Sequence, residues 1–353
     1  MTSALKPWLW AATVCAFGIA GYAGYRSVQP LAPHTSTPAP DALHMLVIPE
    51  GATLRQVATQ LEREHLIRSR LAFVLLGKWH SDERRIHAGE YALHAGMRPD
   101  EILADIVNGR VVLHTVTIPE GYTAVQIAEL LGQKELTDAG EIRRLVRDRE
   151  FIRSLNLDER TLEGYLFPET YRFPRNAKAK EVIKAMVAGL EQALTPELQA
   201  RAKDLEMNTH TVLTMASLIE KETGVDAERE LVSAVFHNRL RQKIPLQSDP
   251  TVIYGLSQFD GNLRKQDLES NSPYNTYRIA GLPPGPIANP GAKSIRAALY
   301  PAPVKYLYFV SKNDGSHVFA NSLSEHNQNV DRYQKQQKHR RAVRGDRQVA
   351  SER

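Results

Sequence analysis

Two glutamates near the end of an apolar segment are the side chains of this sequence with the type and spacing needed for acid catalysis. Glu220 and Glu222 close the run 207–224, MNTHTVLTMASLIEKETG. A carboxyl group among apolar side chains has its charged form disfavoured, so its pKa rises from about 4.3 toward neutrality. Such a group can protonate the leaving oxygen of a glycosidic bond. The competing interpretation is that both glutamates are solvated residues at the end of a core helix. Periodicity does not choose between Glu220 and Glu222 as the acid.

The segment that carries the two glutamates is predicted to be a buried helix. Apolar residues recur at helical spacing and form one face: Val212, Met215, Ala216 and Ile219. Three polar residues at the start of the segment can cap its first turn: Asn208, Thr209 and Thr211. Gly224 can end the helix, and at about 100° per residue Lys221 points away from the apolar face. The two glutamates then flank the buried face.

The start of the chain contains a hydrophobic segment long enough to cross a membrane. The run from Pro7 to Tyr25 is uncharged over about 19 residues, and roughly 20 apolar residues span a bilayer as a helix. Lys6 and Arg26 flank it, and aromatic residues lie near both ends. We expect a short cytoplasmic end at 1–6 and a transmembrane anchor at 7–26; a cleaved signal peptide is the alternative. Both interpretations export the rest of the chain, which begins with a Pro-rich linker at 27–41.

Charge and cysteine content exclude several classes of function. The chain has 45 basic and 40 acidic residues and a formal net charge of +5. The basic tail 335–353 holds seven basic and two acidic residues, so the rest of the chain is neutral overall. A neutral body argues against a nucleic-acid partner, and the tail is predicted to be a solvated end. Cys15 is the single cysteine, so the chain can form neither a disulfide framework nor a cysteine metal site.

Two copies of one short pattern occur in the first half of the chain. Residues 45–67 and 116–133 each predict a strand, the sequence Ile-Pro-Glu-Gly and an amphipathic helix, with Glu50 and Glu120 in equivalent places. In each copy the proline and glycine turn the chain, and Thr53 or Thr123 caps the helix. Units of this size resemble the LysM fold, a carbohydrate-binding module, and we assign 42–155 to a LysM-like α+β domain. The alternative is a small α+β domain that only positions the catalytic part.

Four motifs in the second half are predicted to lie around the glutamate helix. They are LEGYLFPETYRF (162–173), LQSDPTVIYG (246–255), SPYNTY (272–277) and GLPPGPIANPG (281–291). The first is rich in aromatic residues, including Tyr165, and can either line a sugar groove or form a hydrophobic plug between domains. The second places polar residues before a Pro-initiated helix, and the last cannot form a helix or a central strand. Rigid polar loops beside a buried acid suit a binding groove.

The predicted architecture is α+β, with an N-terminal transmembrane helix, the LysM-like domain and a mixed α/β catalytic domain at 156–334 built around the glutamate helix. Further helices are predicted at 179–194, 196–205 and 229–240, a strand pair at 305–310 and 317–320, and a last helix from Ser324.

Together the motifs resemble the endolytic murein transglycosylase family, the membrane-anchored YceG-like lytic transglycosylases. ASLIEKETG, LEGYLFPETY, LQSDPTVIYG, SPYNTY and GLPPGPIANPG all occur, and the resemblance covers nearly the whole chain. It implies a single-pass inner-membrane protein whose periplasmic catalytic domain cuts the bond between N-acetylmuramic acid and N-acetylglucosamine inside nascent strands and so terminates their elongation. It also implies that Glu220 is the catalytic acid, that the substrate is peptidoglycan, and that peptidoglycan synthases are partners.

One catalytic carboxyl suffices for the reaction that the resemblance implies. Ordinary glycosidases use two carboxyls. In a lytic transglycosylase the 6-hydroxyl of the sugar, already held near the anomeric carbon, takes the second role, and the product is a 1,6-anhydro ring. By analogy with lysozyme-like transglycosylases, we expect Gln247, Tyr274 and Asn275 to hold sugar amide and hydroxyl groups. Glu222 and Tyr165 complete the predicted substrate site.

Two other classes of function remain open from the sequence. A non-catalytic peptidoglycan-binding membrane anchor would place the function in the LysM-like part, but a buried acid with polar loops near it argues against that class. A pyridoxal-phosphate lyase would need a Schiff-base lysine such as Lys221, which points away from the apolar face, and the sequence has no evident phosphate-binding glycine loop. We therefore expect no cofactor.

Overall fold

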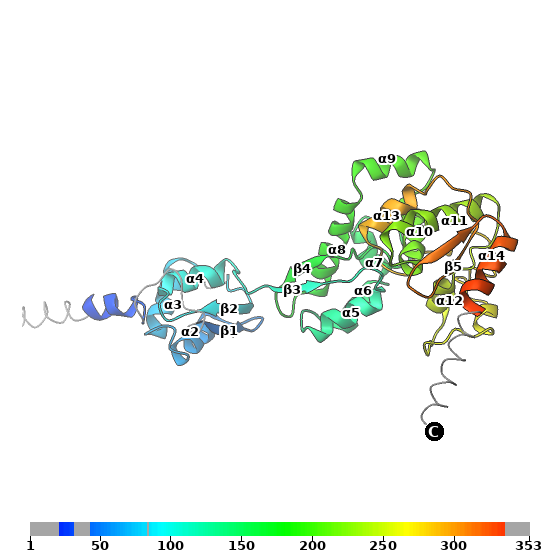
Figure 1. Cartoon of the computed structure of the whole chain (residues 1–353). Coiled ribbons are helices and arrows are strands. Elements are labelled where there is room, and N and C mark those ends of the chain that lie inside the picture. The colour runs from blue at the N-terminus through cyan, green and yellow to red at the C-terminus, as the bar shows by residue number, and fades with distance from the viewer. Residues whose placement is uncertain (1–20, 32–42, 83–84, 336–353) are drawn as a thin grey trace, which may run out of the picture. The chain divides into compact units, whose positions relative to one another are not determined.

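The computed structural model describes residues 21–31, 43–82 and 85–335, which form two compact units (Figure 1). The first unit comprises the described residues up to His114 together with Arg172–Asn176, and the second comprises 115–171 and 177–335. Residues 7–20 of the predicted anchor, 32–41 of the linker and 336–353 of the basic tail lie outside the described residues. Residues 21–27 are helical, and within the described ranges no helix has both the length and the apolar composition that a bilayer span requires.

The first unit packs three helices and an antiparallel strand pair around one apolar core. Its elements are β1 (His44–Ile48), α2 (Leu54–Arg63), α3 (Arg70–Trp79), β2 (Gly89–Leu93) and α4 (Pro99–Val107). His44 of β1 pairs with Leu93 of β2, and Ile48 pairs with Gly89. Leu46 and Ile48, at alternate positions of β1, are buried in the core. α2 buries the apolar face expected from its sequence: Leu54, Val57, Ala58 and Leu61.

Both copies of the Ile-Pro-Glu-Gly repeat adopt the predicted conformation of strand, turn and helix. The turn glycines have positive φ, 77° at Gly51 and 73° at Gly121, where an L side chain would be strained. Thr53 and Thr123 cap the following helices, each in a capping box with a glutamine three residues later. The predicted caps are therefore confirmed. The first copy lies in the first unit and the second copy in the second unit.

The remaining elements belong to the second unit, except that His114 of β3 and residues 172–173 of β4 belong to the first. They are β3 (His114–Thr117), α5 (Ala124–Gln133), α6 (Ala139–Leu145), α7 (Arg149–Ser154), β4 (Thr170–Phe173), α8 (Ala179–Ala193), α9 (Pro196–Asp204), α10 (Thr209–Glu222), α11 (Arg229–Arg241), α12 (Asp249–Gly255), α13 (Ala292–Leu299), β5 (Tyr308–Ser311), β6 (His317–Ala320) and α14 (Leu323–Val330), with short helices η2 (Asp226–Glu228), η3 (Asp267–Glu269) and η4 (Asp331–Lys335). Residues 115–155, which the sequence analysis assigns to the LysM-like domain, are part of this unit by contact. The functional division at residue 155 stays a prediction.

Helix α10 is the predicted glutamate helix, and α11 and α13 pack beside it (Figure 1). Asn208 Oδ1 accepts the N–H of Thr211 at 2.8 Å, which confirms one of the predicted caps. Every residue from Val212 to Ile219 is buried, so protein surrounds the helix on all sides. The helix ends at Glu222 with Thr223 as its C-cap, so Gly224 directly follows the end of the helix, but its φ is not positive. Thr223 leaves the helix in an extended conformation, in which its hydroxyl oxygen accepts the N–H of Val225 at 3.0 Å.

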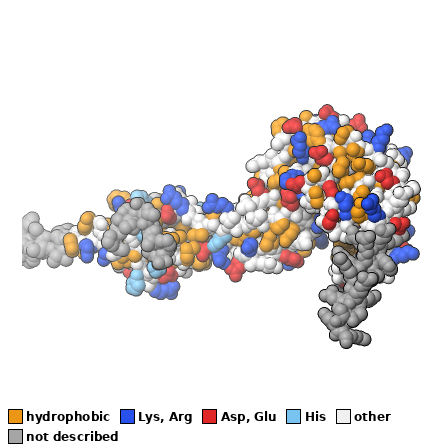
Figure 2. Space-filling view, in the orientation of Figure 1, with side chains coloured by type: hydrophobic (Ala, Val, Ile, Leu, Met, Phe, Trp, Pro, Cys, Tyr) orange, Lys and Arg blue, Asp and Glu red, His pale blue; other side chains and the backbone are white. Residues whose placement is uncertain are grey.

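The other predicted elements occur close to their expected positions. α8, α9 and α11 match the three predicted helices to within one residue at each end, and β5 pairs with β6 in antiparallel fashion, with Tyr308 opposite Ala320. The segment 281–291 contains neither helix nor strand, as its prolines and glycines predict. On the face shown in Figure 2, basic and acidic side chains are interspersed over both units, as expected of a body with balanced charge.

Candidate active site

Glu220 lies in the last turn of α10, where two donors hold its carboxyl group. Nη1 of Arg229 lies 3.2 Å from Oε1, and the backbone N–H of Gly291 donates to Oε2 at 3.0 Å. Arg229 is the first residue of α11 and Gly291 ends the 281–291 loop, so three segments distant in sequence meet here. Only 7% of the Glu220 side chain is exposed. Glu220 is therefore a fixed, nearly buried carboxyl and not a solvated helix end.

Arg229 lies within ion-pair distance of carboxyl groups from three segments of the chain. Its Nη1 also donates to Ser294 Oγ at 2.6 Å, its Nε lies 3.3 Å from Asp226 Oδ1, and its Nη2 lies 3.9 Å from Glu120 Oε2. Lys293 forms a further ion pair with Asp226. The Arg229 side chain is 7% exposed, so its guanidinium group is a buried counter-charge with a rigid set of donors. It fixes the positions of the acids around it.

Glu120 belongs to the second Ile-Pro-Glu-Gly turn, which is attached to the 281–291 loop. Gly121 N–H donates to the Asn289 carbonyl, and Asn289 N–H donates to the Tyr122 carbonyl, both at 2.9 Å. These two backbone hydrogen bonds join the turn to the loop that ends at Gly291. The turn and the loop together bring the Glu120 carboxyl to the Glu220 cluster.

The sequence analysis did not assign Glu120 to the site. Burial, and then the charge of Glu220, raise the pKa of Glu120, while the charge of Arg229 lowers it. A signal was present, because a glutamate stands at the same place in both copies of the repeat. The neighbouring sequence does not distinguish Glu50 from Glu120, however, because the two glutamates differ in the distant segments that their turns contact.

Gly291→Ala should displace Glu120 with little loss of stability. The added Cβ would lie 1.9 Å from Glu120 Oε1, although a φ of −77° suits alanine. The Glu120 side chain is 45% exposed and can swing toward solvent. We expect activity to fall to the level of Glu120→Ala, while the free energy of unfolding drops by less than about 2 kcal/mol. Activity assays and urea unfolding measure the two effects.

Gly224→Ala is the matched control, because its added Cβ meets no atom within 4 Å. It should keep the parental activity and stability. If Gly291→Ala lowers activity while Glu120→Ala does not, the substitution has moved the loop, and Glu120 is not required for activity.

Glu222 lies two residues beyond Glu220 and has different neighbours. It accepts a short hydrogen bond from the Ser248 hydroxyl. Burial raises the pKa of Glu222 to about 7; the Ser248 hydrogen bond opposes this shift and the charge of Asp249 adds to it. Tyr277 OH donates to Asp249 Oδ1 at 2.6 Å. The 246–255 and 272–277 motifs therefore meet at Glu222, whereas the 281–291 loop meets Glu220.

Gln247 and Asn275 differ in what they can offer a substrate. Gln247 is exposed and has a positive φ of 51°. Asn275 is fully buried, and its Nδ2 donates to the carbonyls of Leu268 at 2.9 Å and Ser270 at 2.8 Å. Its amide hydrogens therefore stabilise the loop that contains Leu268 and Ser270. Among the described residues no hydrogen bond joins either side chain to Glu220, and their binding roles stay predictions.

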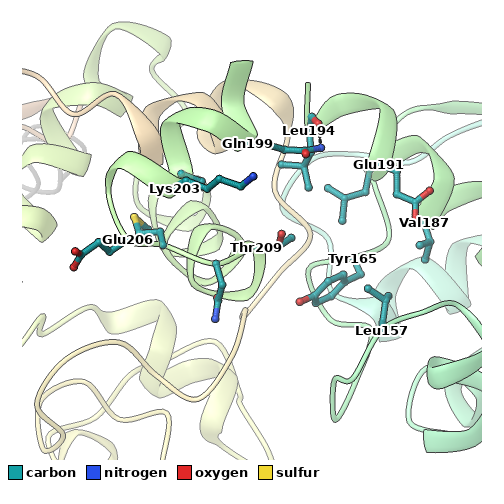
Figure 3. A pocket seen from close by; sticks show the side chains of 13 residues that line it. Leu157, Tyr165, Val187, Glu191, Leu194, Gln199, Lys203, Glu206 and Thr209 are labelled. Carbon is teal, nitrogen blue, oxygen red and sulfur yellow. Dashed lines mark hydrogen bonds between the residues drawn. The ribbon is translucent and has the colours of Figure 1, made fainter. Parts of the chain in front are cut away.

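Tyr165 faces a cavity of about 700 Å³ between α8, α9 and the start of α10. Figure 3 shows its ring in the cavity wall near Leu157. Its hydroxyl lies 3.4 Å from His210 Nδ1, and the same nitrogen lies 2.8 Å from Glu159 Oε2. No hydrogen bond within the described part of the chain connects Tyr165 to Glu220. Its predicted contact with substrate therefore concerns this cavity.

A further buried carboxyl, Glu163 of the aromatic motif, is attached to the same 281–291 loop. Its Oε1 accepts from Asn289 Nδ2 at 3.0 Å and from the Ala124 N–H at 2.9 Å, and its Oε2 accepts from Tyr254 OH at 3.2 Å. The residue is 4% exposed. Burial raises the pKa of Glu163 to about 7, although all three donors oppose the shift. Sequence reasoning placed Glu163 among aromatic residues but gave it no role.

Glu163→Gln should flatten the dependence of stability on pH. The folded protein holds this proton up to a pKa of about 7, whereas the unfolded chain releases it near the ordinary glutamate pKa of 4.5. The folded state binds more protons between these values, so the free energy of unfolding falls as pH rises, by on the order of 3 kcal/mol for this group. Urea unfolding from pH 4.5 to 7.5 measures the slope.

Part of the slope should survive in Glu163→Gln, because Glu222 titrates over the same range. Glu163→Gln combined with Glu222→Gln should remove both contributions. The control is Glu169→Gln, which changes an exposed residue of the same motif and should leave the slope unchanged. A slope that Glu163→Gln does not reduce would contradict the raised pKa of Glu163.

The site is composed of carboxyl, guanidinium, hydroxyl and backbone N–H groups. In the described ranges no group of three or more His, Cys, Asp or Glu side chains is arranged to hold a metal ion. The groups present can transfer protons and donate hydrogen bonds to an oxygen-rich ligand.

Comparisons with known proteins agree on one family. A family model described as YceG-like matches residues 46–332. A Bacillus subtilis protein named endolytic murein transglycosylase is 35% identical over 302 residues, which cover 81% of this chain and 83% of the relative. A Streptococcus pneumoniae protein of the same name is 33% identical over 316 residues. The match covers 80% of this chain and 57% of that relative.

A solved structure extends the likeness to three dimensions. The crystal structure of a YceG-like protein from Listeria monocytogenes is 33% identical, with a TM-score of 0.57, over 82% of this chain and 99% of that one. The family model matches most of the chain, and the Bacillus subtilis relative is matched over 83% of its length, so the chain belongs to the YceG-like family.

Proposed function

We propose that this chain is an endolytic lytic transglycosylase that cleaves the bond between N-acetylmuramic acid and N-acetylglucosamine within nascent peptidoglycan strands. Relatives named endolytic murein transglycosylase support the substrate and the class of reaction. The structural observation that carries the proposal is Glu220, a nearly buried carboxyl fixed by Arg229 and the Gly291 N–H. Cleavage inside a strand ends its elongation.

Glu220 is the proposed general acid and base. Its protonated carboxyl gives a proton to the glycosidic oxygen, the bond from that oxygen to C1 breaks, and the leaving sugar departs with a hydroxyl. The 6-hydroxyl oxygen of muramic acid bonds to C1, and the Glu220 carboxylate accepts the hydroxyl proton. No water is consumed, and the product carries a 1,6-anhydro ring.

Glu222 is the second candidate for the acid. Its pKa of about 7 means that much of the carboxyl is protonated at neutral pH, as a general acid requires. Glu220 comes first because it is the glutamate implied by the match to the family motif, and because the cluster of Arg229, Glu120 and a backbone N–H surrounds it.

The location and the partners belong to the proposal as well. We assign residues 7–26 to an inner-membrane anchor and the body to the periplasm, where nascent strands and their synthases are found. The small α+β first unit supports a LysM-like contact with glycan strands.

Mass spectrometry of purified peptidoglycan digested by the purified chain tests the reaction. Internal fragments that end in 1,6-anhydro-muramic acid are the expected products. Reducing ends would identify a hydrolase. Protein that binds the strands and never shortens them would favour the non-catalytic membrane anchor.

A further inference from the structure

A second pocket lies beside Glu163, and three arginines are among the residues that line it. Its volume is about 340 Å³, and residues of α5, α6, α12 and three loops form its wall. The lining residues are Ala124, Val125, Arg143, Val146, Arg147, Arg160, Thr161, Glu163, Tyr254 and Tyr274. All of them belong to the second unit. A pocket of this size can hold part of a flexible ligand.

The three arginines of this pocket have no carboxylate partner in the part of the chain that the structure describes. Arg143, Arg147 and Arg160 are exposed, and none forms an ion pair within 4.0 Å there. Neighbouring arginines do form such pairs: Arg144 lies 3.1 Å from Asp148, and Arg149 lies 3.4 Å from Asp158. The positive charges around the pocket are thus available to an external anion.

Glu163 does not neutralise these arginines. Both of its oxygens already accept hydrogen bonds, from Asn289, Ala124 and Tyr254, and the residue is almost fully buried. The charge of Arg147 lowers the pKa of Glu163, but it is the smallest of the causes that shift this pKa. The three arginines therefore give the pocket a net positive charge, because the Glu163 carboxyl is already hydrogen-bonded within the protein.

The remaining wall is apolar and aromatic. The rings of Tyr254 and Tyr274 lie 4.8 Å apart at 57°, and Ala124, Val125 and Val146 add aliphatic surface. Guanidinium groups bind carboxylates in a bidentate manner, and the apolar wall suits carbon atoms attached to the carboxylate. A bare phosphate would leave this wall without a partner.

The pocket is connected to the Glu220 cluster through one short segment of chain. Asn289 bonds to Glu163 by its side chain, and Gly291, two residues later, donates its N–H to Glu220. The two carboxyls are therefore held by residues only two positions apart in one loop. In murein strands, muramic acid carries a short peptide with free carboxylates.

We propose that the pocket of Arg143, Arg147 and Arg160 binds a carboxylate of the murein peptide stem and so favours strands that carry stems. The inference rests on the proposed function for its substrate class. Tyr274, expected from the sequence to contact substrate, would then contact the peptide instead of the sugar.

A binding experiment tests the pocket without catalysis. Calorimetry compares a synthetic murein stem peptide, the same peptide with its carboxylates amidated, and inorganic phosphate. The stem peptide should bind the unaltered chain, and Arg147→Gln combined with Arg160→Gln should weaken binding at least about tenfold, because charge-assisted hydrogen bonds are lost. Arg149→Gln, an exposed arginine outside the pocket, is the control and should bind normally. Equal binding by the double variant, by the amidated peptide or by phosphate would overturn the proposal, as would no binding at all.

A cleavage experiment separates this inference from the proposed function. On strands with intact stems, the double variant should raise KM and leave kcat unchanged; on strands stripped of peptide by an amidase, it should match the parent. An equal change on both substrates would overturn a role in stem recognition. If the parent cleaves neither substrate but binds the stem peptide through the arginines, the proposed function fails and the pocket stands.

Discussion

Glu220→Gln should cleave murein strands about 10² to 10⁴ times more slowly than the parent, because the amide keeps the shape of the side chain but cannot act as the proton donor. The amide can still receive a hydrogen bond from the Gly291 N–H or from Arg229, so the fold should be retained. The measurement is the rate of appearance of 1,6-anhydro ends by mass spectrometry. The thermal unfolding midpoint of the variant, determined in parallel, separates a catalytic effect from a loss of folded protein.

Two further substitutions make the result specific. Glu230→Gln changes an exposed acid next to Arg229 and should keep the parental rate. Glu222→Gln should have a smaller effect than Glu220→Gln. Activity of Glu220→Gln within a fewfold of the parent would remove Glu220 from the mechanism. If Glu222→Gln alone abolishes cleavage, the raised pKa of Glu222 marks the acid and the two assignments exchange.

Arg229→Met should destabilise the protein by about 3 to 5 kcal/mol, because removal of the guanidinium group leaves the nearly buried Glu220 carboxyl without its counter-charge. Glu220, Glu120 and Asp226 all lie within 4.0 Å of the guanidinium group. Cleavage should fall together with stability, since Glu220 loses the side chain that positions it. Urea unfolding at several pH values and a cleavage assay measure the two effects.

The loss of stability in Arg229→Met should depend on pH. Arg229 is one of the charges that lower the pKa of Glu120, so the folded-state pKa of that carboxyl rises further in the variant. An acid with a raised folded-state pKa weakens the fold only when it ionises, so the deficit should be smallest below about pH 4.3 and grow as pH rises. Arg149→Gln, which breaks an exposed pair, should change stability by at most about 1 kcal/mol. A deficit independent of pH would contradict the electrostatic explanation.

Local patterns predicted most of the helices and caps of this chain. The threonine caps of α2 and α5, the Asn208 cap of α10 and the irregular 281–291 loop all depend on residues within a few positions of each other. Such signals are complete in the sequence, because a cap needs only a side-chain oxygen and an N–H two or three residues later. The end of α10 lies within two residues of Gly224, although the extended Thr223, whose hydroxyl accepts the N–H of Val225, leads the chain out of the helix.

The composition of the site could be predicted only in part. The sequence analysis expected the polar loops to surround one acid, whereas Glu220 and Glu222 are separated by roughly 200° around the helix axis and meet different loops. The contact between Asn289 and Glu163 joins residues 126 positions apart, and periodicity contains no information about such a pair. Arg229 and Glu120 were missed for the same reason. Each is ordinary in its local sequence and acquires its role from long-range packing.

The two Ile-Pro-Glu-Gly turns show that the same short sequence adopts the same backbone conformation in two places, whereas the contacts of its glutamate differ. Both turns have the same glycine conformation and the same threonine cap, so an exchange of residues 49–53 with 119–123 would preserve the local geometry of each. The glutamate at 120 lies in the Glu220 cluster because Asn289 and Gly291 lie beside that turn. An engineer who grafts this five-residue turn into another strand-to-helix connection would therefore obtain the fold of the turn, and would have to supply a partner loop to obtain its acid.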